Sequence, residues 1–335
     1  MRRRRIWLVP LLALVLGGTA LGLWLTPSDR YILLPGSAQP VAPLVELENE
    51  QAAAAAGGAG IYMVDILVRR ENLLERLWPG VEAGADTRDE RQLNPHGVSE
   101  GQRRQTLSLD MTRSQQIAAA VALESLGYDV DATPNGAEID TVIPDAPASG
   151  TLRPGDVIVK LGRREIETPN DLRDAMEGVE PGEKVELTYR RSGGLTDATV
   201  GTQAATDDPD RAVIGVIVEQ AASIELPIDV KIDAGPIGGP SAGLAFALDI
   251  VDELGADVDK GRRIVVTGEL GLDGIVSAIG GVKQKAIGAK NAGADLFVVP
   301  ADNAEEAREY AEGLDVVAVD DFDEALDALE VDPTS

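Results

Sequence analysis

The chain of 335 residues contains no cysteine and only one histidine. Without cysteine, neither disulfides nor a thiol nucleophile is available. The histidine, His96, lies in a polar stretch from 86 to 105 that predicts a surface loop, far upstream of the candidate nucleophile described below. A Ser-His-Asp triad is therefore not expected, and we expect neither a metal site nor a cofactor.

Basic residues are also few relative to acidic ones, with 30 lysines and arginines against 57 aspartates and glutamates. The formal net charge of the chain is therefore −27. Such a chain would be repelled by a phosphate backbone, so nucleic acid is not an expected partner. The acidic residues are spread along the chain and predict a solvated surface. A Gly-x-x-x-x-Gly-Lys-Ser/Thr phosphate loop is missing as well. We therefore expect no ATP-driven unfolding by this chain.

Long hydrophobic runs are absent except at the N-terminus, where Arg2 to Arg5 precede the uncharged stretch from Ile6 to Leu25. About 20 such residues in a helix span a hydrocarbon core of roughly 30 Å. Trp7 and Trp24 lie near the two ends, as interfacial aromatics do. Because positive charge stays in the cytoplasm, the pattern predicts a single-pass cell-membrane anchor with an extracytoplasmic remainder. A cleaved signal peptide is the alternative.

One serine, Ser241, stands among small residues in Gly-Pro-Ile-Gly-Gly-Pro-Ser-Ala-Gly-Leu at 235–244, directly before an apolar run. Glycines allow the backbone positive φ and close approach to a ligand. The start of a helix offers unpaired N–H groups to an oxyanion. The pattern is typical of a displayed nucleophile, although a serine N-cap after a Gly-Pro turn has the same local signature.

With a histidine base excluded, a serine needs a lysine that is dehydrated and therefore neutral. The chain has seven lysines, so the candidates are few. Lys260 lies in a polar turn, where an ammonium stays solvated. Lys283, Lys285 and Lys290 follow a Gly-Gly turn at the start of a predicted helix. Lys283 and Lys285 are two positions apart and cannot share a helix face, so one of them is expected to point inward.

Three ordered motifs resemble the proteolytic domain of Lon peptidases, over roughly residues 210 to 330. They are Gly-Pro-Ser-Ala-Gly at 239–243, Val-Thr-Gly-Glu at 266–269 and Ile-Gly-Gly-Val-Lys-Gln-Lys at 279–285. The resemblance implies a Ser-Lys dyad of Ser241 and Lys285, with Thr267 orienting the lysine. It also implies supporting positions in the same motifs, namely Gly239, Pro240, Gly280 and Gly281. A hexameric homo-oligomer is a further implication of the resemblance.

The chain departs from full-length Lon enzymes in two respects. Those enzymes usually carry an aspartate three residues before the serine, where this chain has Gly238. Their ATPase half is not found here. Ile-Gly-Gly-Pro-Ser instead resembles the membrane-anchored, PDZ-containing branch of Lon-like proteases.

Residues from about 136 to 202 carry a second pattern, in which short strands surround a helix beginning near Asn170. Their order, with Pro-Gly-Asp-Val-Ile at 154–158, resembles a PDZ domain of the protease-associated type. Such a domain binds a peptide as an added strand whose end is held by backbone N–H groups. The segment Asn135, Gly136 and Ala137 is the predicted peptide-binding position. A small α+β connector without a peptide site is the alternative.

Four regions follow from these patterns: a basic stub and transmembrane anchor at 1–28, an extended and β-rich connector at 29–111, a PDZ-like domain at 112–205, and a Lon-like proteolytic domain at 206–332. The expected fold class is α/β (α+β) for the proteolytic domain, preceded by the small β-rich domain and the transmembrane helix. The expected function is ATP-independent serine endopeptidase activity on unfolded or extended protein and peptide segments. The alternative is a non-catalytic PDZ scaffold whose Lon-like domain only binds or assembles.

Overall fold

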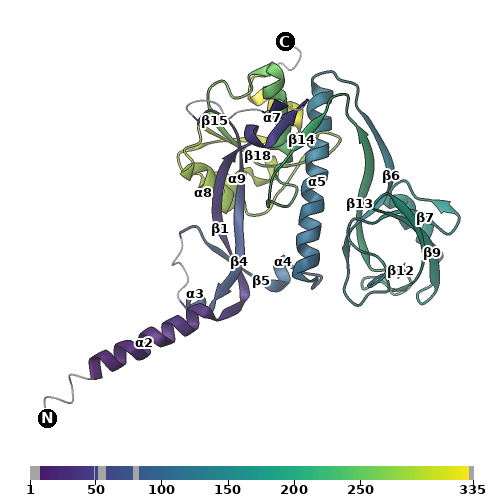
Figure 1. The fold of residues 1–335 in the computed structure, drawn as a ribbon, viewed down its shortest axis with the longest axis horizontal. Coiled ribbons are helices and arrows are strands. Elements are labelled where there is room, and N and C mark those ends of the chain that lie inside the picture. Colours follow the sequence, from purple (N-terminus) through teal and green to yellow (C-terminus); the bar gives the residue numbers. More distant parts are fainter. Residues whose placement is uncertain (1–7, 49, 52–57, 78–82, 332–335) are drawn as a thin grey trace.

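The computed structural model describes residues 8–48, 50–51, 58–77 and 83–331. Within them the chain forms two large sheets, and the long helix α5 (Glu100–Ser125) stands between the two (Figure 1). The first sheet is mixed and covered by helices on both faces. The second belongs to a smaller β-rich unit.

The first sheet has the strand order β19-β18-β15-β4-β1-β5. Its strands are β1 (Pro27–Pro40), β4 (Gly60–Asn72), β5 (Asp86–Asp89), β15 (Arg263–Val266), β18 (Leu296–Pro300) and β19 (Asp315–Val319). β15 pairs in parallel with β4 and β18, whereas β1 pairs antiparallel with β4 and β5. The strands of the predicted connector therefore share one sheet with those of the predicted proteolytic region, and this sheet crosses the limits predicted between them.

The central strand β15 is apolar on both faces, as a parallel strand buried under helices must be. Ile264 and Val266 belong to the hydrophobic cluster that contains α7, while Val265 belongs to the cluster that contains α8. Helices α7 and α8 consequently lie on opposite faces of the sheet. The covering helices are α7 (Gly243–Val251), α8 (Val282–Asn291), α9 (Ala304–Tyr310) and α10 (Phe322–Ala328).

Helix α5 connects the two units. Its N-cap Ser99 accepts a hydrogen bond from the Gln102 amide, and its C-terminal half packs against α7 through buried alanines. The sequence predicted a surface loop over residues 86–105, which includes the first residues of this helix. That prediction is wrong for residues 100–105, which form the start of α5 and whose polar side chains bond to the second unit. Gln102 Nε2, for example, donates to the Val142 carbonyl over 2.7 Å.

The second sheet has the order β10-β9-β7-β6-β13, with β8 paired to β7. Its elements are β6 (Asp131–Val142), β7 (Val157–Leu161), β8 (Arg164–Glu165), α6 (Pro169–Met176), β9 (Lys184–Arg191), β10 (Gly194–Gly201) and β13 (Val216–Glu225). Thr168 caps α6 through a reciprocal capping box with Asp171, which explains why the helix begins here. β13 comes from beyond residue 205 yet pairs with β6, so this sheet also crosses a predicted limit.

The remaining elements are short. They are η1 (Ala42–Leu44), β2 (Val45–Leu47), β3 (Glu50–Gln51), α3 (Leu73–Leu77), α4 (Glu90–Leu93), β11 (Gln203–Ala204), β12 (Ala212–Val213), β14 (Val230–Ile232), η3 (Asp252–Ala256), β16 (Glu269–Leu270), β17 (Val276–Ser277) and η4 (Ala301–Asn303).

The N-terminal helix α2 (Leu8–Leu25) covers most of the predicted anchor. Arg2 to Arg5, Ile6 and Trp7 lie outside the described residues. Over the residues that it describes, the structure contains no helix with the length and apolarity that crossing a membrane requires.

Candidate active site

The segment that carries Ser241 is held in place by α5. Gly239 has φ +94° and donates its amide hydrogen to the Leu107 carbonyl over 2.8 Å. Ser114 Oγ donates to the Pro240 carbonyl over 3.0 Å. These contacts give the predicted supporting positions a structural function, because they fix the backbone immediately before the serine.

Ser241 does not cap the following helix. The N-cap of α7 is Ala242, and no side chain caps it. Instead, Ser241 Oγ accepts a hydrogen bond from Lys285 Nζ over 2.6 Å. The N-cap alternative for this serine is therefore wrong.

Lys285 is the inward-pointing lysine of α8. Its side chain is buried, with 3% of the residue exposed, and its Nζ also donates to Thr267 Oγ1 over 2.9 Å. Lys283 points elsewhere, with Nζ 3.5 Å from the Ala85 carbonyl and over the Tyr310 ring. Lys260 lies at the surface and pairs with Glu330. One lysine therefore reaches the serine, as the two-residue spacing predicted.

The serine and the lysine come from opposite faces of one sheet. Ser241 lies two residues before the start of α7, and Lys285 lies on α8. They meet where β15 ends at Val266, and Thr267 follows that strand. The end of a parallel strand leaves room between the layers, which is where sites of α/β sheets commonly lie.

Thr267 joins the three residues into one network. It is buried, and its hydroxyl donates to the Ser241 carbonyl over 3.1 Å while it accepts from Lys285. The Gly268 amide donates to the same carbonyl over 3.0 Å. The backbone and side chain of Ser241 are thus both tied to the segment that follows β15.

Burial lowers the pKa of the Lys285 amine to about 8, and the charge of Asp65 partly opposes this effect. A buried ammonium loses its hydration, so the neutral amine is favoured. At pH 7 about one lysine in ten would be neutral, since the pH is one unit below the pKa. The neutral amine can accept the hydroxyl proton of the serine, with which it already shares a hydrogen bond.

Backbone donors stand next to the serine. In the part of the chain that the structure describes, the amide N–H groups of Ser241 and Ala242 have no protein acceptor. They lie at the start of α7, where the helix dipole is positive. The arrangement can stabilise an oxyanion formed beside Ser241 Oγ.

The two glycines of the predicted Gly-Gly pair differ in how closely other residues pack against them. Gly281 is the N-cap of α8 with φ +72°, and a Cβ there would lie 2.9 Å from Ile66 Cδ1. A Cβ at Gly280 would meet no atom within 4 Å. Close packing of α8 on β4 therefore requires glycine at the second position only.

The predicted peptide-binding segment has no free backbone edge. Asn135, Gly136 and Ala137 lie in β6, between β7 and β13, and Ala137 has partners on both sides. Asn135 Oδ1 accepts from Arg190. A peptide strand therefore cannot add at Ala137, because the strands on both sides of it are already present.

A groove lies instead between α6 and the sheet edge β13. Its cavity has a volume of 510 Å³, with Leu172 and Met176 on the helix side and Ile214, Val216 and Val218 on the strand side. β13 ends the strand order of the sheet in the described part of the chain. The signal missed in the sequence was Val-Ile-Gly-Val at 213–216, a glycine between apolar residues directly before a strand.

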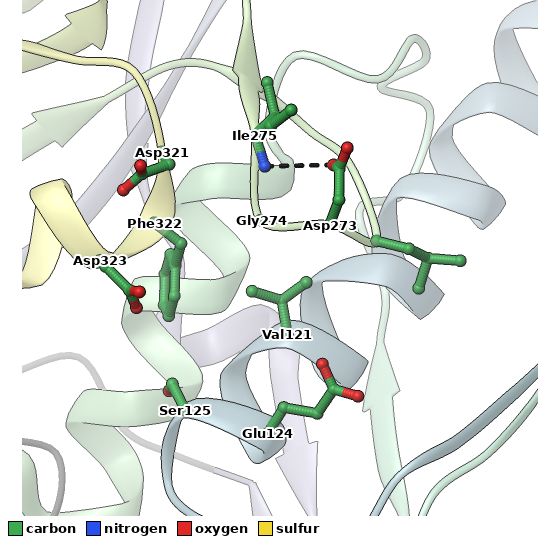
Figure 2. A pocket seen from close by; sticks show the side chains of 10 residues that line it. Val121, Glu124, Ser125, Asp273, Gly274, Ile275, Asp321, Phe322 and Asp323 are labelled. Carbon is green, nitrogen blue, oxygen red and sulfur yellow. Dashed lines mark hydrogen bonds between the residues drawn. The ribbon is translucent and has the colours of Figure 1, made fainter.

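A separate hollow of 460 Å³ lies between α5, the turn after β16 and the start of α10 (Figure 2). Val121 and Phe322 lie across it, and carboxylates surround it. Ser125 lines it, but its hydroxyl donates to the Ala122 carbonyl. This hollow therefore contains no activated serine.

His96 is exposed, in keeping with a solvated loop residue. Within the described residues, no three histidine, aspartate or glutamate side chains form a group that could hold a metal ion.

Comparisons with known proteins agree with the two units. Residues 212–331 match the family model of the Lon protease (S16) C-terminal proteolytic domain, and residues 124–202 match the PDZ domain. The chain therefore contains a Lon-type proteolytic domain, whose relatives indicate a serine peptidase, and a PDZ domain.

Three curated relatives illustrate the extent of the match. Lon protease 2 of Bacillus subtilis is 37% identical over 98 residues, covering 29% of this chain and 18% of that protein. The Lon protease of Roseiflexus castenholzii is 34% identical over 117 residues, covering 34% and 14%. The mitochondrial Lon protease homolog of Bos taurus is 37% identical over 98 residues, covering 28% and 10%. The match thus spans less than a fifth of each relative.

Among solved structures, the PDZ domain of an SdrC-like protein from Listeria monocytogenes is similar. It is 20% identical with a TM-score of 0.24, and the match covers 25% of this chain and 87% of that one.

Proposed function

We propose that this chain is a membrane-tethered, ATP-independent serine endopeptidase that cleaves unfolded or extended protein segments outside the cytoplasm. The observation that carries the proposal is the buried Lys285 Nζ, which lies 2.6 Å from Ser241 Oγ. A lysine in water stays protonated at neutral pH. Burial lowers the pKa of Lys285 and so favours its neutral form, which can act as a base.

In the first step, neutral Lys285 accepts the hydroxyl proton while Ser241 Oγ attacks the carbonyl carbon of the scissile peptide. The carbonyl oxygen becomes an oxyanion, to which the amides of Ser241 and Ala242 donate. The Lys285 ammonium then gives its proton to the leaving nitrogen, and the C–N bond breaks. An acyl-enzyme ester on Ser241 and a free amine remain.

In the second step, neutral Lys285 takes a proton from water as the water oxygen attacks the ester carbonyl. The tetrahedral intermediate collapses, and Oγ leaves with the proton from Lys285. Thr267 keeps Nζ pointed at Ser241 throughout, since it contacts both residues. No nucleotide enters either step.

The groove beside β13 would deliver substrate ends. An extended peptide can pair with the free edge of β13 and place apolar side chains against Leu172 and Met176. Gly215 has φ +82° and opens the groove next to the strand. The amides of Ile214 and Gly215 have no protein acceptor within the described residues, so they can receive a terminal carboxylate.

Membrane tethering and orientation rest on the sequence, through Arg2 to Arg5 and the apolar stretch after them. Protease added to spheroplasts is expected to digest the part after Leu25. Complete protection of that part would reverse the orientation.

The alternative function is a non-catalytic PDZ scaffold. A fluorophosphonate probe separates the two, because it reacts with an activated serine. Wild-type protein is expected to be labelled at Ser241, and Lys285→Arg is expected to lose labelling while remaining folded. Equal labelling of wild type and Ser241→Ala, or none in a folded wild type, would favour the scaffold.

A further inference from the structure

Two pairs of consecutive residues on α5 bond in two directions. Thr106 bonds to the PDZ domain, while the next residue, Leu107, bonds to the segment 238–243 that contains Ser241. Arg113 and Ser114 repeat this arrangement about two helical turns later. One side of α5 therefore holds the PDZ domain, and another side holds the Ser241 segment.

Side chains of α5 bond to the PDZ domain at four places. The contacts are Gln102 Nε2 to the Val142 carbonyl over 2.7 Å, Gln105 Nε2 to the Pro154 carbonyl over 2.8 Å, Thr106 Oγ1 to the Asp140 carbonyl over 2.7 Å, and Arg113 Nη2 to Glu138 Oε2 over 2.8 Å. Three of the four acceptors belong to β6, which pairs with the groove strand β13. The helix is thus attached to an inner strand of the PDZ sheet.

The start of the Ser241 segment lies directly against the other side of α5. The Gly239 amide donates to the Leu107 carbonyl over 2.8 Å. A Cβ at Gly238 would lie 2.9 Å from Leu107 Cβ, so glycine is what lets the two backbones approach this closely. The helix and the backbone before the serine are therefore in direct contact.

Ser114 holds the same segment on both sides of Ser241. It is buried, with 3% of the residue exposed, and its Oγ donates to the Pro240 carbonyl over 3.0 Å. A Cβ at Gly243 would lie 2.8 Å from the same Oγ. Such close packing leaves little free space, so the segment has to follow α5 when the helix shifts.

The position of this part of α5 depends on the PDZ domain. The C-terminal half of the helix packs on α7 through buried alanines. Residues 102–114 come before most of that contact and run beside the PDZ domain (Figure 1). Because a helix transmits a shift of one side to the other, their distance from the Ser241 segment depends on the bonds to β6.

Both chemical features of Ser241 rely on this backbone. Its Oγ lies 2.6 Å from Lys285 Nζ, and the amides of Ser241 and Ala242 are the proposed oxyanion donors. A shift of the segment would therefore displace the nucleophile and the donors together.

We infer that Thr106 is a positioning residue for Ser241 that acts through α5, and that the PDZ domain thereby helps to align the nucleophile. The inference rests on the proposed function and adds no chemical step. Residues 102–114 lie outside both ranges that match known families, 124–202 and 212–331, so neither match implies it. The PDZ domain then has two functions: its groove receives substrate ends, and its strand β6 supports the rate at Ser241.

The test uses a short peptide substrate with an amidated C-terminus, which offers the groove no terminal carboxylate. The double variant Gln102→Met, Thr106→Val removes two bonds to β6 with little change in side-chain volume. Its kcat is expected to fall about three- to tenfold with little change in KM, because a misplaced nucleophile slows the reaction without weakening ground-state binding. The rate at which a fluorophosphonate probe labels Ser241 should fall by the same factor.

Two further variants separate alignment from general stability. Gln102→Met, Thr106→Ser keeps the hydroxyl on α5 and should recover most of the loss. Thr188→Val is the matched control, because it removes a threonine hydroxyl that bonds to Asp197 elsewhere in the PDZ sheet. Its kcat and labelling rate should equal those of wild type.

Ser114→Ala tests the route through the helix. It removes the bond to the Pro240 carbonyl, so the double variant should cause a smaller loss in this background than in wild type. Losses that multiply in full would show that the two sides of α5 act independently, and would overturn the inference.

A folded double variant with the kcat and labelling rate of wild type would also overturn it, as would an equal loss in Thr188→Val. If the double variant does not fold, Thr106→Val by itself is judged by the same outcomes, with an expected loss of about two- to threefold. These results presuppose turnover by wild type that requires Ser241. Wild-type protein without such turnover would instead count against the proposed function.

Discussion

Ser241 and Lys285 come from opposite faces of one sheet, and their Oγ and Nζ atoms lie 2.6 Å apart at the end of β15. The lysine is buried, and its amine donates hydrogen bonds to Ser241 and Thr267. Burial and hydrogen bonding thus act on the same atom, Lys285 Nζ.

The first prediction concerns pH. Only neutral Lys285 can act as the base, and its pKa is lowered to about 8 by burial. Therefore kcat/KM should rise as pH rises through about 8 and then level off. Lys285→Arg, which stays protonated, should be nearly as inactive as Ser241→Ala. Lys283→Ala is the control and should keep most activity. Normal turnover in folded Lys285→Arg would contradict the assignment.

Thr267→Val should lower kcat about 10- to 100-fold with little change in KM, because misplaced catalytic groups cost rate rather than ground-state binding. Valine has nearly the same shape but neither accepts from Lys285 nor donates to the Ser241 carbonyl. Thr267→Ser keeps the hydroxyl and should recover most of the loss. Equal kinetics for the Val and Ser variants would show that the hydroxyl has no catalytic effect.

Cleavage should not need nucleotide, because the chain has no phosphate loop. An unstructured casein-like substrate should be cut at the same rate with and without ATP, while a stably folded domain should resist. The measurement is gel or mass-spectrometric analysis of purified protein, with Ser241→Ala as the blank. Turnover that depends on ATP hydrolysis would refute this expectation.

The groove beside β13 predicts a separation between protein and peptide substrates. Met176→Asp places a charge among the apolar groove residues. It should raise KM severalfold for a protein with a free matching C-terminus and spare a short peptide that reaches Ser241 directly. Asn135→Ala, outside the groove, should leave both unchanged. Equal loss of both substrates in Met176→Asp would indicate a packing function for this domain.

Through their resemblance to the Lon proteolytic domain, the motifs around Ser241, Thr267 and Lys285 predicted which residues would meet. Lysine scarcity and the two-residue spacing also indicated that one of Lys283 and Lys285 would point inward. The strands and helix of the PDZ-like region were readable as well, because alternation and capping residues are short-range signals. Its peptide-binding position was not, since the sequence gave no sign that Ala137 pairs on both edges.

The amino-acid sequence by itself determined the chemistry available: a serine displayed before a helix, no histidine near it, a few lysines, and no phosphate loop. The tertiary structure alone decided that β1 and β4 complete the sheet of β15, that β13 ends the strand order of the second sheet among the described residues, and that Lys285 reaches Ser241. The physical reason is that strand pairing joins segments far apart in the chain, such as Met63 with Val266. Periodicity within a segment shows which face of a strand is buried. Which other strand it pairs with depends on packing across the whole molecule.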